Sequence, residues 1–275
     1  MNKQKHTIGF IGGGNMARSL IGGLVRAGYP TTALSVADPN ESIRAALTTD
    51  FGIDATSDNQ QIADQCDVVV LAVKPQVLKE VATQLRTGQR PHQLILTVAA
   101  GIRTTSLGHW LGGDTPIVRA MPNTPALVQS GATGLFANLQ VNETQRDLAE
   151  SIMRAAGLVQ WVEDENQMDA VTALSGSGPA YLFLVMEAME KAGQQLGLPA
   201  ETARLLTLQT AFGAAKLALE IEEDPAVLRQ NVTSPGGTTE RAIQVLQQEG
   251  LEDVFNKALR AARDRAQELA DQLGK

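Results

Sequence analysis

The sequence predicts an α/β N-terminal domain, with a parallel sheet covered by helices on both faces, followed by an all-α C-terminal domain. Up to about residue 160, short apolar runs alternate with amphipathic helical patterns, as is typical of parallel strands joined by helices. From about Glu165 onward this alternation stops and the pattern is helical throughout. A glycine-rich segment, directly after the first apolar run, is the third observation.

Continuous apolar runs predict strands that are buried on both faces. The expected strands are Thr7–Ile11, Leu34–Ala37, Val68–Val73, Leu94–Val98, Pro116–Ala120, Ala132–Ala137 and Val159–Val162. The helices expected between them are Met16–Ala27, Ser42–Phe51, Gln76–Arg86, Thr104–Leu111 and a segment near Glu143–Ala156. These elements define an N-terminal domain of residues 1–163.

Residues 164–275 are expected to form the helical domain. Helix-favouring Ala, Leu, Glu and Gln dominate Ala180–Leu196, Ala200–Glu220 and Leu251–Leu273. The second of these segments carries small residues over Ala211–Ala218, which permits another helix to approach closely, either within the domain or across a dimer.

The composition indicates a globular protein of two domains. The chain has 275 residues, is 43% hydrophobic and carries a formal net charge of −7. The negative charge argues against nucleic acids and anionic membranes as partners. No apolar run approaches the roughly 20 residues of a membrane-spanning helix, and the N-terminus has no apolar core of a signal peptide. We therefore expect a cytoplasmic protein.

The cysteine and histidine content argues against a metal site. Cys66 is the single cysteine, and His6, His92 and His109 are scattered along the chain. No cluster of His, Cys and carboxylate residues has the spacing of a transition-metal site, so no metal is expected. Hydrolases with a Ser–His–Asp or Cys–His arrangement have equally little support. A reactive group supplied by a cofactor is the better expectation.

The glycine-rich segment has the G-x-G-x-x-A pattern of a dinucleotide-binding loop. Gly12 permits the tight turn, Gly14 lets the backbone approach a pyrophosphate, and Ala17 lets the next helix pack on the strand. The pyrophosphate would lie at the N-terminus of that helix, where free N–H groups and the helix dipole stabilise an anion. A tight turn without a ligand is the alternative. The expected cofactor contacts here are Ile11, Gly12, Gly13, Gly14, Asn15 and Met16.

Further cofactor contacts are expected where other strands end, because ligands of open α/β sheets bind at the carboxyl edge. Asp38 follows the second strand, where an acid accepts hydrogen bonds from the ribose 2′-OH and repels a 2′-phosphate; a turn cap is the alternative. Lys74 offers a positive charge near cofactor or substrate, or is an ordinary surface lysine. The remaining candidates at this edge are Asn59, Ala72, Val73, Pro75, Val98 and Ala100.

Two small-residue segments interrupt the helical half. Thr233–Glu240 reads Thr-Ser-Pro-Gly-Gly-Thr-Thr-Glu, and Pro and Gly are unfavourable inside a helix. A helix that begins here aims free N–H groups and two Thr hydroxyls at an anion. Ser175–Ala180 reads Ser-Gly-Ser-Gly-Pro-Ala and is equally unusual. Both segments are suited to bind a small acid.

A further segment, Arg119–Ala126, reads Arg-Ala-Met-Pro-Asn-Thr-Pro-Ala. Together with Gly12–Ala17, Ala72–Pro75 and the two small-residue segments, it makes the chain closely resemble pyrroline-5-carboxylate reductase over essentially its whole length. The resemblance implies NAD(P)H-dependent reduction of 1-pyrroline-5-carboxylate to L-proline, the last step of proline biosynthesis. It also implies a Rossmann-like domain, then a helical domain for substrate binding and dimerisation, in a homodimer with interlocked helical domains, often assembled into a larger ring such as a decamer.

The resemblance also assigns residues to the reaction. Thr239 matches the most characteristic threonine of the family and is the first candidate for a catalytic residue, with a helix cap as a compatible alternative. Glu165 is a second catalytic candidate, near the substrate nitrogen, or else a surface charge at the domain junction. Asn231 is expected to reach the cofactor from the helical domain. The expected substrate contacts are Ser175, Gly176, Ser177, Gly178, Gly237, Thr238 and Thr239.

This reaction needs no strong protein acid. Hydride passes to an imine carbon that is most electrophilic when the nitrogen is protonated, and a protonated cyclic imine can arrive from solution. The protein must chiefly orient the two rings and neutralise the substrate carboxylate. Many relatives carry a small hydroxyl residue where this chain has Asp38, and they commonly prefer NADPH. The choice between NADPH and NADH is therefore open.

Two other functions agree with parts of the sequence. A 3-hydroxyacid dehydrogenase also joins a Rossmann domain to a helical one, but it needs a catalytic lysine on a helix, and Lys191 and Lys216 lie in no such motif. A non-catalytic dinucleotide sensor would need neither of the small-residue segments. Consumption of NAD(P)H with the imine distinguishes the three functions.

Overall fold

The computed structural model describes residues 6–85 and 92–275, which form two compact units. The sheet unit comprises Met1–Ser177 and Ala261–Lys275, and the helical unit comprises Gly178–Arg260. The domain boundary expected after residue 163 stays a prediction. Arg86, expected as the last residue of a helix, lies outside the described residues.

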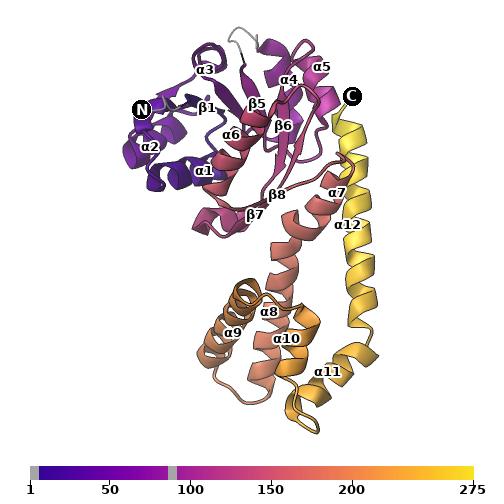
Figure 1. Ribbon diagram of the computed structural model, residues 1–275. Helices are drawn as coiled ribbons and strands as arrows, with labels where there is room; N and C mark the ends of the chain where they lie inside the picture. Colours follow the sequence, from indigo (N-terminus) through magenta and orange to yellow (C-terminus); the bar gives the residue numbers. More distant parts are fainter. Residues whose placement is uncertain (1–5, 86–91) are drawn as a thin grey trace. The chain divides into compact units, whose positions relative to one another are not determined.

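The sheet unit is built on one eight-stranded sheet with the order β3-β2-β1-β4-β5-β6-β7-β8 (Figure 1). The strands are β1 (Ile8–Ile11), β2 (Leu34–Ala37), β3 (Asp54–Thr56), β4 (Val68–Leu71), β5 (Leu94–Thr97), β6 (Ile117–Met121), β7 (Gly131–Ala137) and β8 (Gly157–Trp161). β1 pairs in parallel with both β2 and β4, so the strand order reverses at β1. Such a reversal opens a crevice at the carboxyl ends of the strands, where ligands of these folds bind.

Helices cover both faces of the sheet, and each face has its own apolar core. The helices of one face are α1 (Asn15–Arg26), α2 (Glu41–Phe51) and α6 (Glu143–Arg154), and those of the other are α3 (Asn59–Gln65), α4 (Pro75–Gln84) and α5 (Thr104–Trp110). Apolar strand residues such as Phe10 and Val69 are fully buried on the two faces. The predicted Rossmann-like class is confirmed.

One strand departs from the expected parallel arrangement. β7 pairs antiparallel with β6 and parallel with β8. The connection between β6 and β7 contains only a 3-10 turn, η2 (Thr124–Val128), and is too short for the crossover that two parallel neighbours require.

The rest of the chain is helical, as predicted. In the sheet unit, α7 (Gln167–Val171) leads into a π-helical turn, η3 (Thr172–Gly176). The helical unit contains α8 (Gly178–Gln195), α9 (Ala200–Glu220), α10 (Pro225–Asn231), α11 (Thr238–Gln248) and the first part of α12 (Leu251–Leu273). Among the described helices, none combines the length and apolarity needed to cross a membrane.

Candidate active site

The glycine-rich loop joins β1 to α1 at the carboxyl edge of the sheet. Gly12 has a φ of +96°, and a Cβ there would lie 2.8 Å from the carbonyl oxygen of Ala72. The Gly12 N–H donates to the carbonyl oxygen of Ala37, at the end of β2. Glycine is therefore needed both for the left-handed backbone and for the close approach of the chain beyond β4. The tight turn predicted at Gly12 is present.

Gly14 and the start of α1 leave space and donors for an anion. A Cβ on Gly14 would meet no atom within 4 Å, and no side chain caps α1 in the described structure. The first N–H groups of a helix have no partner within it, so those of Asn15 and Met16 are available to a phosphate. Ala17 is fully buried against the sheet. These features fit the pyrophosphate of a dinucleotide.

Asp38, directly after β2, binds the glycine-rich loop. One carboxylate oxygen accepts the N–H of Gly13 at 2.8 Å, and the other accepts the N–H of Asn40 at 2.8 Å. The residue is only 8% exposed. The turn cap considered from the sequence is therefore present. Because a carboxylate oxygen accepts more than one hydrogen bond, the ribose contact is compatible with this geometry and stays a prediction.

The backbone joins the ends of neighbouring strands beside the loop. The N–H of Ala72 donates to the carbonyl oxygen of Ile11 at 2.8 Å, and the N–H of Val98 donates to that of Leu71 at 3.1 Å. Val73 lies against Gly12, and Ala100 follows two residues after Val98. These predicted cofactor residues therefore lie along one edge, where β1, β4 and β5 end.

Three further predicted cofactor residues lie at the ends of helices. Lys74 is exposed and immediately precedes Pro75, the first residue of α4. Asn59 is half-buried and is the first residue of α3. Asn231 is the last residue of α10 in the helical unit, where its amide donates to Glu223 at 3.1 Å. Its predicted contact with the cofactor stays a prediction.

The first small-residue segment begins in the π-helical turn η3. The N–H of Ser177 donates to the carbonyl oxygen of Thr172 at 2.8 Å, and the Ser175 hydroxyl donates to that of Val171 at 3.0 Å. Ser175, Gly176 and Ser177 are half-buried, and Gly178 begins α8 in the helical unit. Such π-helical turns are rare in proteins, and those that occur often lie at functional sites.

The second small-residue segment opens α11. Gly236 has a φ of +71°, and its N–H donates to the carboxylate of Glu240 at 2.8 Å. Gly237 is the N-cap and supplies no side chain, so the N–H groups of Thr238 and Thr239 are available to an anion. Both threonines are exposed in the helical unit. That the two small-residue segments act on one substrate stays a prediction.

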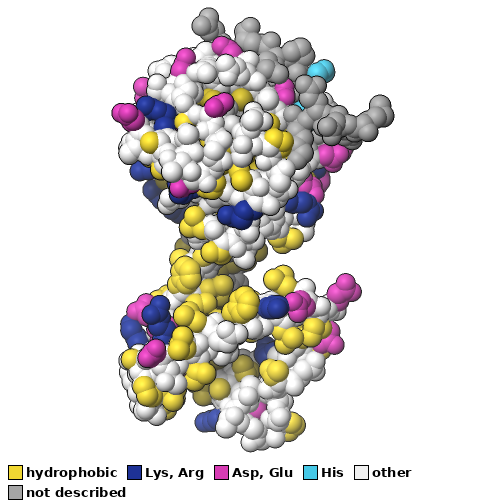
Figure 2. Space-filling model, turned by 90° about the vertical axis from the view of Figure 1, so that its left-hand side faces the viewer, with side chains coloured by type: hydrophobic (Ala, Val, Ile, Leu, Met, Phe, Trp, Pro, Cys, Tyr) yellow, Lys and Arg dark blue, Asp and Glu magenta, His cyan; other side chains and the backbone are white. Residues whose placement is uncertain are grey.

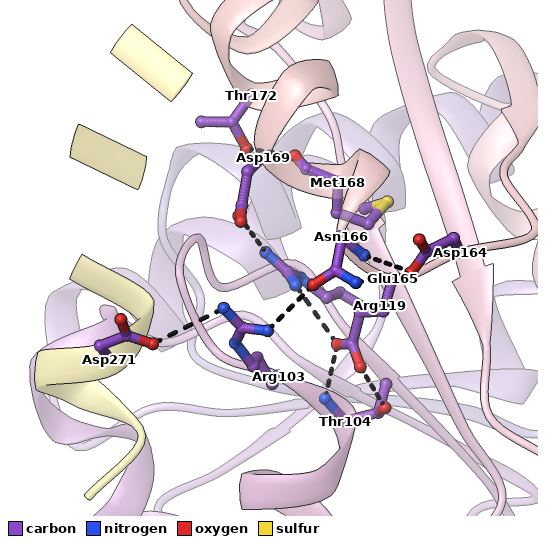
Figure 3. Close-up of polar contacts among 10 residues, drawn as sticks. All are labelled: Arg103, Thr104, Arg119, Asp164, Glu165, Asn166, Met168, Asp169, Thr172 and Asp271. Atoms are coloured by element: carbon purple, nitrogen blue, oxygen red, sulfur yellow. Dashed lines mark hydrogen bonds and ion pairs between the residues drawn. The ribbon is translucent and has the colours of Figure 1, made fainter. Parts of the chain in front are cut away.

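Glu165 lies at the centre of a polar cluster in the sheet unit (Figure 3). One carboxylate oxygen accepts the Thr104 N–H at 2.7 Å and Arg119 at 3.2 Å, and the other accepts the Thr104 hydroxyl at 2.8 Å. The side chain is only 15% exposed, so the surface-charge alternative is wrong. The carboxylate caps α5, which begins at Thr104. Its predicted approach to the substrate nitrogen stays a prediction.

Arg119 is a buried cation between two carboxylates. It lies on β6, pairs with Glu165, and has its second terminal nitrogen 3.7 Å from Asp169 on α7 (Figure 3). A buried charge is stable only when it is paired, and these contacts anchor α7 to the sheet. No role was predicted for Arg119 or Asp169. A signal was present, because an arginine within the apolar strand Ile117–Met121 requires a buried acid as a partner.

Each unit separately offers a helix start that suits an anion. In the described structure, the first N–H groups of α1 in the sheet unit and of α11 in the helical unit have no side-chain cap from the N-cap residue. Among the described residues, no group of three or more His, Cys, Asp or Glu side chains is placed to hold a metal ion.

Comparison with known proteins identifies the family. A family model described as pyrroline-5-carboxylate reductase dimerisation matches residues 165–269, and one described as coenzyme F420-dependent NADP oxidoreductase matches residues 7–101. The pyrroline-5-carboxylate reductase of Pseudomonas aeruginosa is 52% identical over 267 residues, which cover 97% of this chain and 98% of that protein. The chain belongs to the pyrroline-5-carboxylate reductase family.

Solved structures of other pyrroline-5-carboxylate reductases have the same fold. The protein from Coxiella burnetii matches with a TM-score of 0.93 and 51% identity, over 96% of this chain and 98% of that one. The Plasmodium falciparum protein, solved with NADP bound, matches with a TM-score of 0.84 and 28% identity, over 97% and 99%. The resemblance carried by Arg119–Ala126 and the small-residue segments is confirmed.

Proposed function

We propose that the chain reduces 1-pyrroline-5-carboxylate to L-proline with NAD(P)H, the last step of proline biosynthesis. The observation that carries this proposal is the identity of 52% with the Pseudomonas aeruginosa reductase over nearly the full length of both chains. The glycine-rich loop and the start of α11 support it, because the loop suits a dinucleotide and the helix start suits a small acid. The hydroxyacid dehydrogenase and the sensor have no comparable support.

The sheet unit holds the cofactor in this proposal. NAD(P)H, when bound, supplies the hydride that the imine carbon accepts. The N–H groups of Asn15 and Met16 bind the pyrophosphate, which lies in the open space beside Gly14. A side chain at this position would fill that space. Asp38 accepts the ribose hydroxyl, and Lys74 contributes a positive charge at the same edge.

The small-residue segments hold the substrate. The N–H groups of Thr238 and Thr239, with donors of Ser175–Gly178, neutralise its carboxylate and orient its ring against the cofactor. Thr239 is the proposed catalytic residue, in contact with the substrate. The protonated imine enters from solution, so these residues need only bind it and exclude other orientations. Glu165 acts as a positioning residue through Thr104 and Arg119, since both of its oxygens are engaged there.

The working form is a homodimer with interlocked helical domains. Phe183 on α8 is 62% exposed in the single chain, and α8 and α9 carry further exposed apolar side chains. Figure 2 shows hydrophobic side chains gathered on the surface of the helical unit. A second copy that covers these residues would remove them from water. Assembly of dimers into a larger ring such as a decamer, and a cytoplasmic location, stay predictions.

Steady-state kinetics of the purified chain with 1-pyrroline-5-carboxylate and each cofactor in turn test the proposal. We expect oxidation of NADPH or NADH that depends on the imine, and L-proline as the product. Proline-dependent reduction of NAD+ at high pH is the corresponding reverse reaction. Cofactor binding without turnover of the imine would favour the sensor, and turnover of 3-hydroxy acids instead would favour the dehydrogenase.

A further inference from the structure

We propose that Asn123 is a positioning residue that holds Ser175, and with it the substrate segment Ser175–Gly178, in the form that receives the substrate. This inference rests on the proposed function. Asn123 belongs to the segment Met121–Pro125, which marks the family resemblance but has so far been given no chemical role. It lies after β6, in the connection that leads to β7.

The Ser175 carbonyl oxygen needs a partner from outside its own helical turn. In an α-helix that oxygen would accept the N–H of the residue four positions later, which is Pro179 and has no N–H. Ser175 is half-buried, and a backbone acceptor that is removed from water without a partner is costly. The side-chain amide of Asn123 donates to the Ser175 carbonyl oxygen at 3.0 Å and so supplies the missing donor.

The other end of the Asn123 amide is held as well. Its oxygen accepts the N–H of Ala132 on β7 at 2.9 Å, and the residue is only 9% exposed. A donor at one end and an acceptor at the other leave one orientation of the amide that satisfies both contacts. Because Asn123 is hydrogen-bonded to Ala132 on β7, the sheet fixes the position of the Ser175 carbonyl group through this amide.

The neighbouring contact shows how closely this turn lies against the end of β6. A Cβ on Gly176 would lie 2.6 Å from the terminal methyl group of Met121. Displacement of Ser175 would therefore move Gly176 against or away from Met121. The polar groups of Ser175–Gly178, which we propose to contact the substrate, would move with it.

Asn138 offers a matched control for the test. Its oxygen accepts the N–H of Ile117 at 3.0 Å, and its amide donates to the carbonyl oxygen of Thr115 at 2.9 Å. It therefore makes the same pair of backbone contacts, but at the opposite end of β6. Asn123→Asp and Asn138→Asp remove the same kind of donor with the same change of charge.

The experiment measures kcat and KM for 1-pyrroline-5-carboxylate, the Kd of NADPH and the Tm of wild type and both variants. For Asn123→Asp we expect kcat/KM for the imine to fall about ten- to a hundredfold, since small displacements of substrate donors have effects of this size. The Kd of NADPH should stay within about twofold, because the side chain of Asn123 contacts Ser175 and Ala132, and neither is a predicted cofactor residue. Both substitutions should lower the Tm by similar amounts. Asn138→Asp, however, should keep kcat/KM for the imine within about twofold of wild type.

The inference would be overturned if Asn123→Asp kept the kcat/KM of the wild type for the imine. It would also be overturned if Asn123→Asp and Asn138→Asp lost kcat/KM equally. Either result would leave the proposed function intact. An equal loss of NADPH affinity in Asn123→Asp would also overturn the inference. Absence of turnover in the wild type would overturn the proposed function and the inference together. If Asn123→Asp does not fold, Asn123→Ser takes its place, because its hydroxyl is too short for both contacts; the same selective loss for the imine is expected, and its absence counts against the inference.

Discussion

The sheet unit and the helical unit differ in where their apolar side chains lie. The sheet unit has a large buried apolar core, in which Phe10 and Leu71 are fully buried. In the helical unit α8, α10 and α11 contain no buried residue, although α8 carries the continuous apolar run Tyr181–Met186. A helix that is apolar on all sides requires burial on all sides. The sheet unit therefore forms its apolar core within one chain, whereas the helical unit leaves apolar helices that a second surface would cover.

The largest expected effect is on this missing surface. Phe183→Glu places a charge where a second copy is proposed to bind, and burial of each large apolar side chain contributes about 1.5–3 kcal/mol. We expect loss of the oligomer and of most turnover, measured by light scattering and by oxidation of NADPH. Gln272→Glu introduces the same charge on the exposed end of α12 and should retain both. An oligomer that survives Phe183→Glu would contradict this assignment.

The next largest effect is expected at the glycine-rich loop of the sheet unit, which is proposed to bind the cofactor. Gly14→Ala adds a methyl group that meets no protein atom within 4 Å, so the Tm should stay unchanged. We expect the Kd of NADPH to rise about a hundredfold, because contacts with a charged group contribute about 1.5–3 kcal/mol each. Fluorescence titration of NADPH measures this change. Gly108→Ala on α5 is the control, since its Cβ makes ordinary contacts at 3.6 Å and more. Unchanged affinity in Gly14→Ala would place the pyrophosphate elsewhere.

Substitution of Glu165 tests whether this residue is a proton donor or a positioning residue that stabilises the sheet unit. Glu165→Gln should lower the free energy of unfolding by about 2 kcal/mol, because a partly buried charged contact with Arg119 and Thr104 is lost. Glu163→Gln, at a side chain that is 88% exposed, should have almost no effect on stability. The pH dependence of kcat should keep its shape in Glu165→Gln. Loss of one limb of that profile at wild-type stability would instead make Glu165 the proton donor.

The smallest effect concerns nucleotide choice. Asp38→Ser removes the acid beside the predicted ribose position, and we expect the NADPH/NADH ratio of kcat/KM to rise about tenfold. The Tm should also fall, because the contact of Asp38 with Gly13 is lost. Asp147→Ser removes the same charge from the exposed face of α6 and should leave the ratio unchanged. An unchanged ratio in Asp38→Ser would remove the ribose role.

The sequence predicts those parts of the fold whose patterns are local. The apolar runs at Leu34–Ala37 and Ala132–Ala137 coincide with or nearly match β2 and β7, and the helices Ala200–Glu220 and Leu251–Leu273 have the bounds of α9 and α12. β3 is missed because Asp54–Thr56 is short and only partly buried at the edge of the sheet. The antiparallel direction of β7 depends on the length of a connection and not on the strand itself.

The candidate site divides in the same way. Gly12 and Thr238 are predicted because glycine patterns and helix starts are visible in short segments. The contact between Asn123 and Ser175 joins residues that are distant in the sequence, so no local pattern marks it. The cluster of Arg119 with Glu165 and Asp169 is similar, although the arginine within an apolar strand was a usable signal.

The central claim is that the helical unit, unlike the sheet unit, needs a second chain to cover its apolar helices. The most direct test is the mass of the wild-type protein in solution, measured by light scattering at the concentrations used for activity. The difference between the two units predicts an active species that contains at least two chains of 29.2 kDa. A fully active species with the mass of one chain would contradict it, because the helical unit would then function with its apolar helices exposed to water.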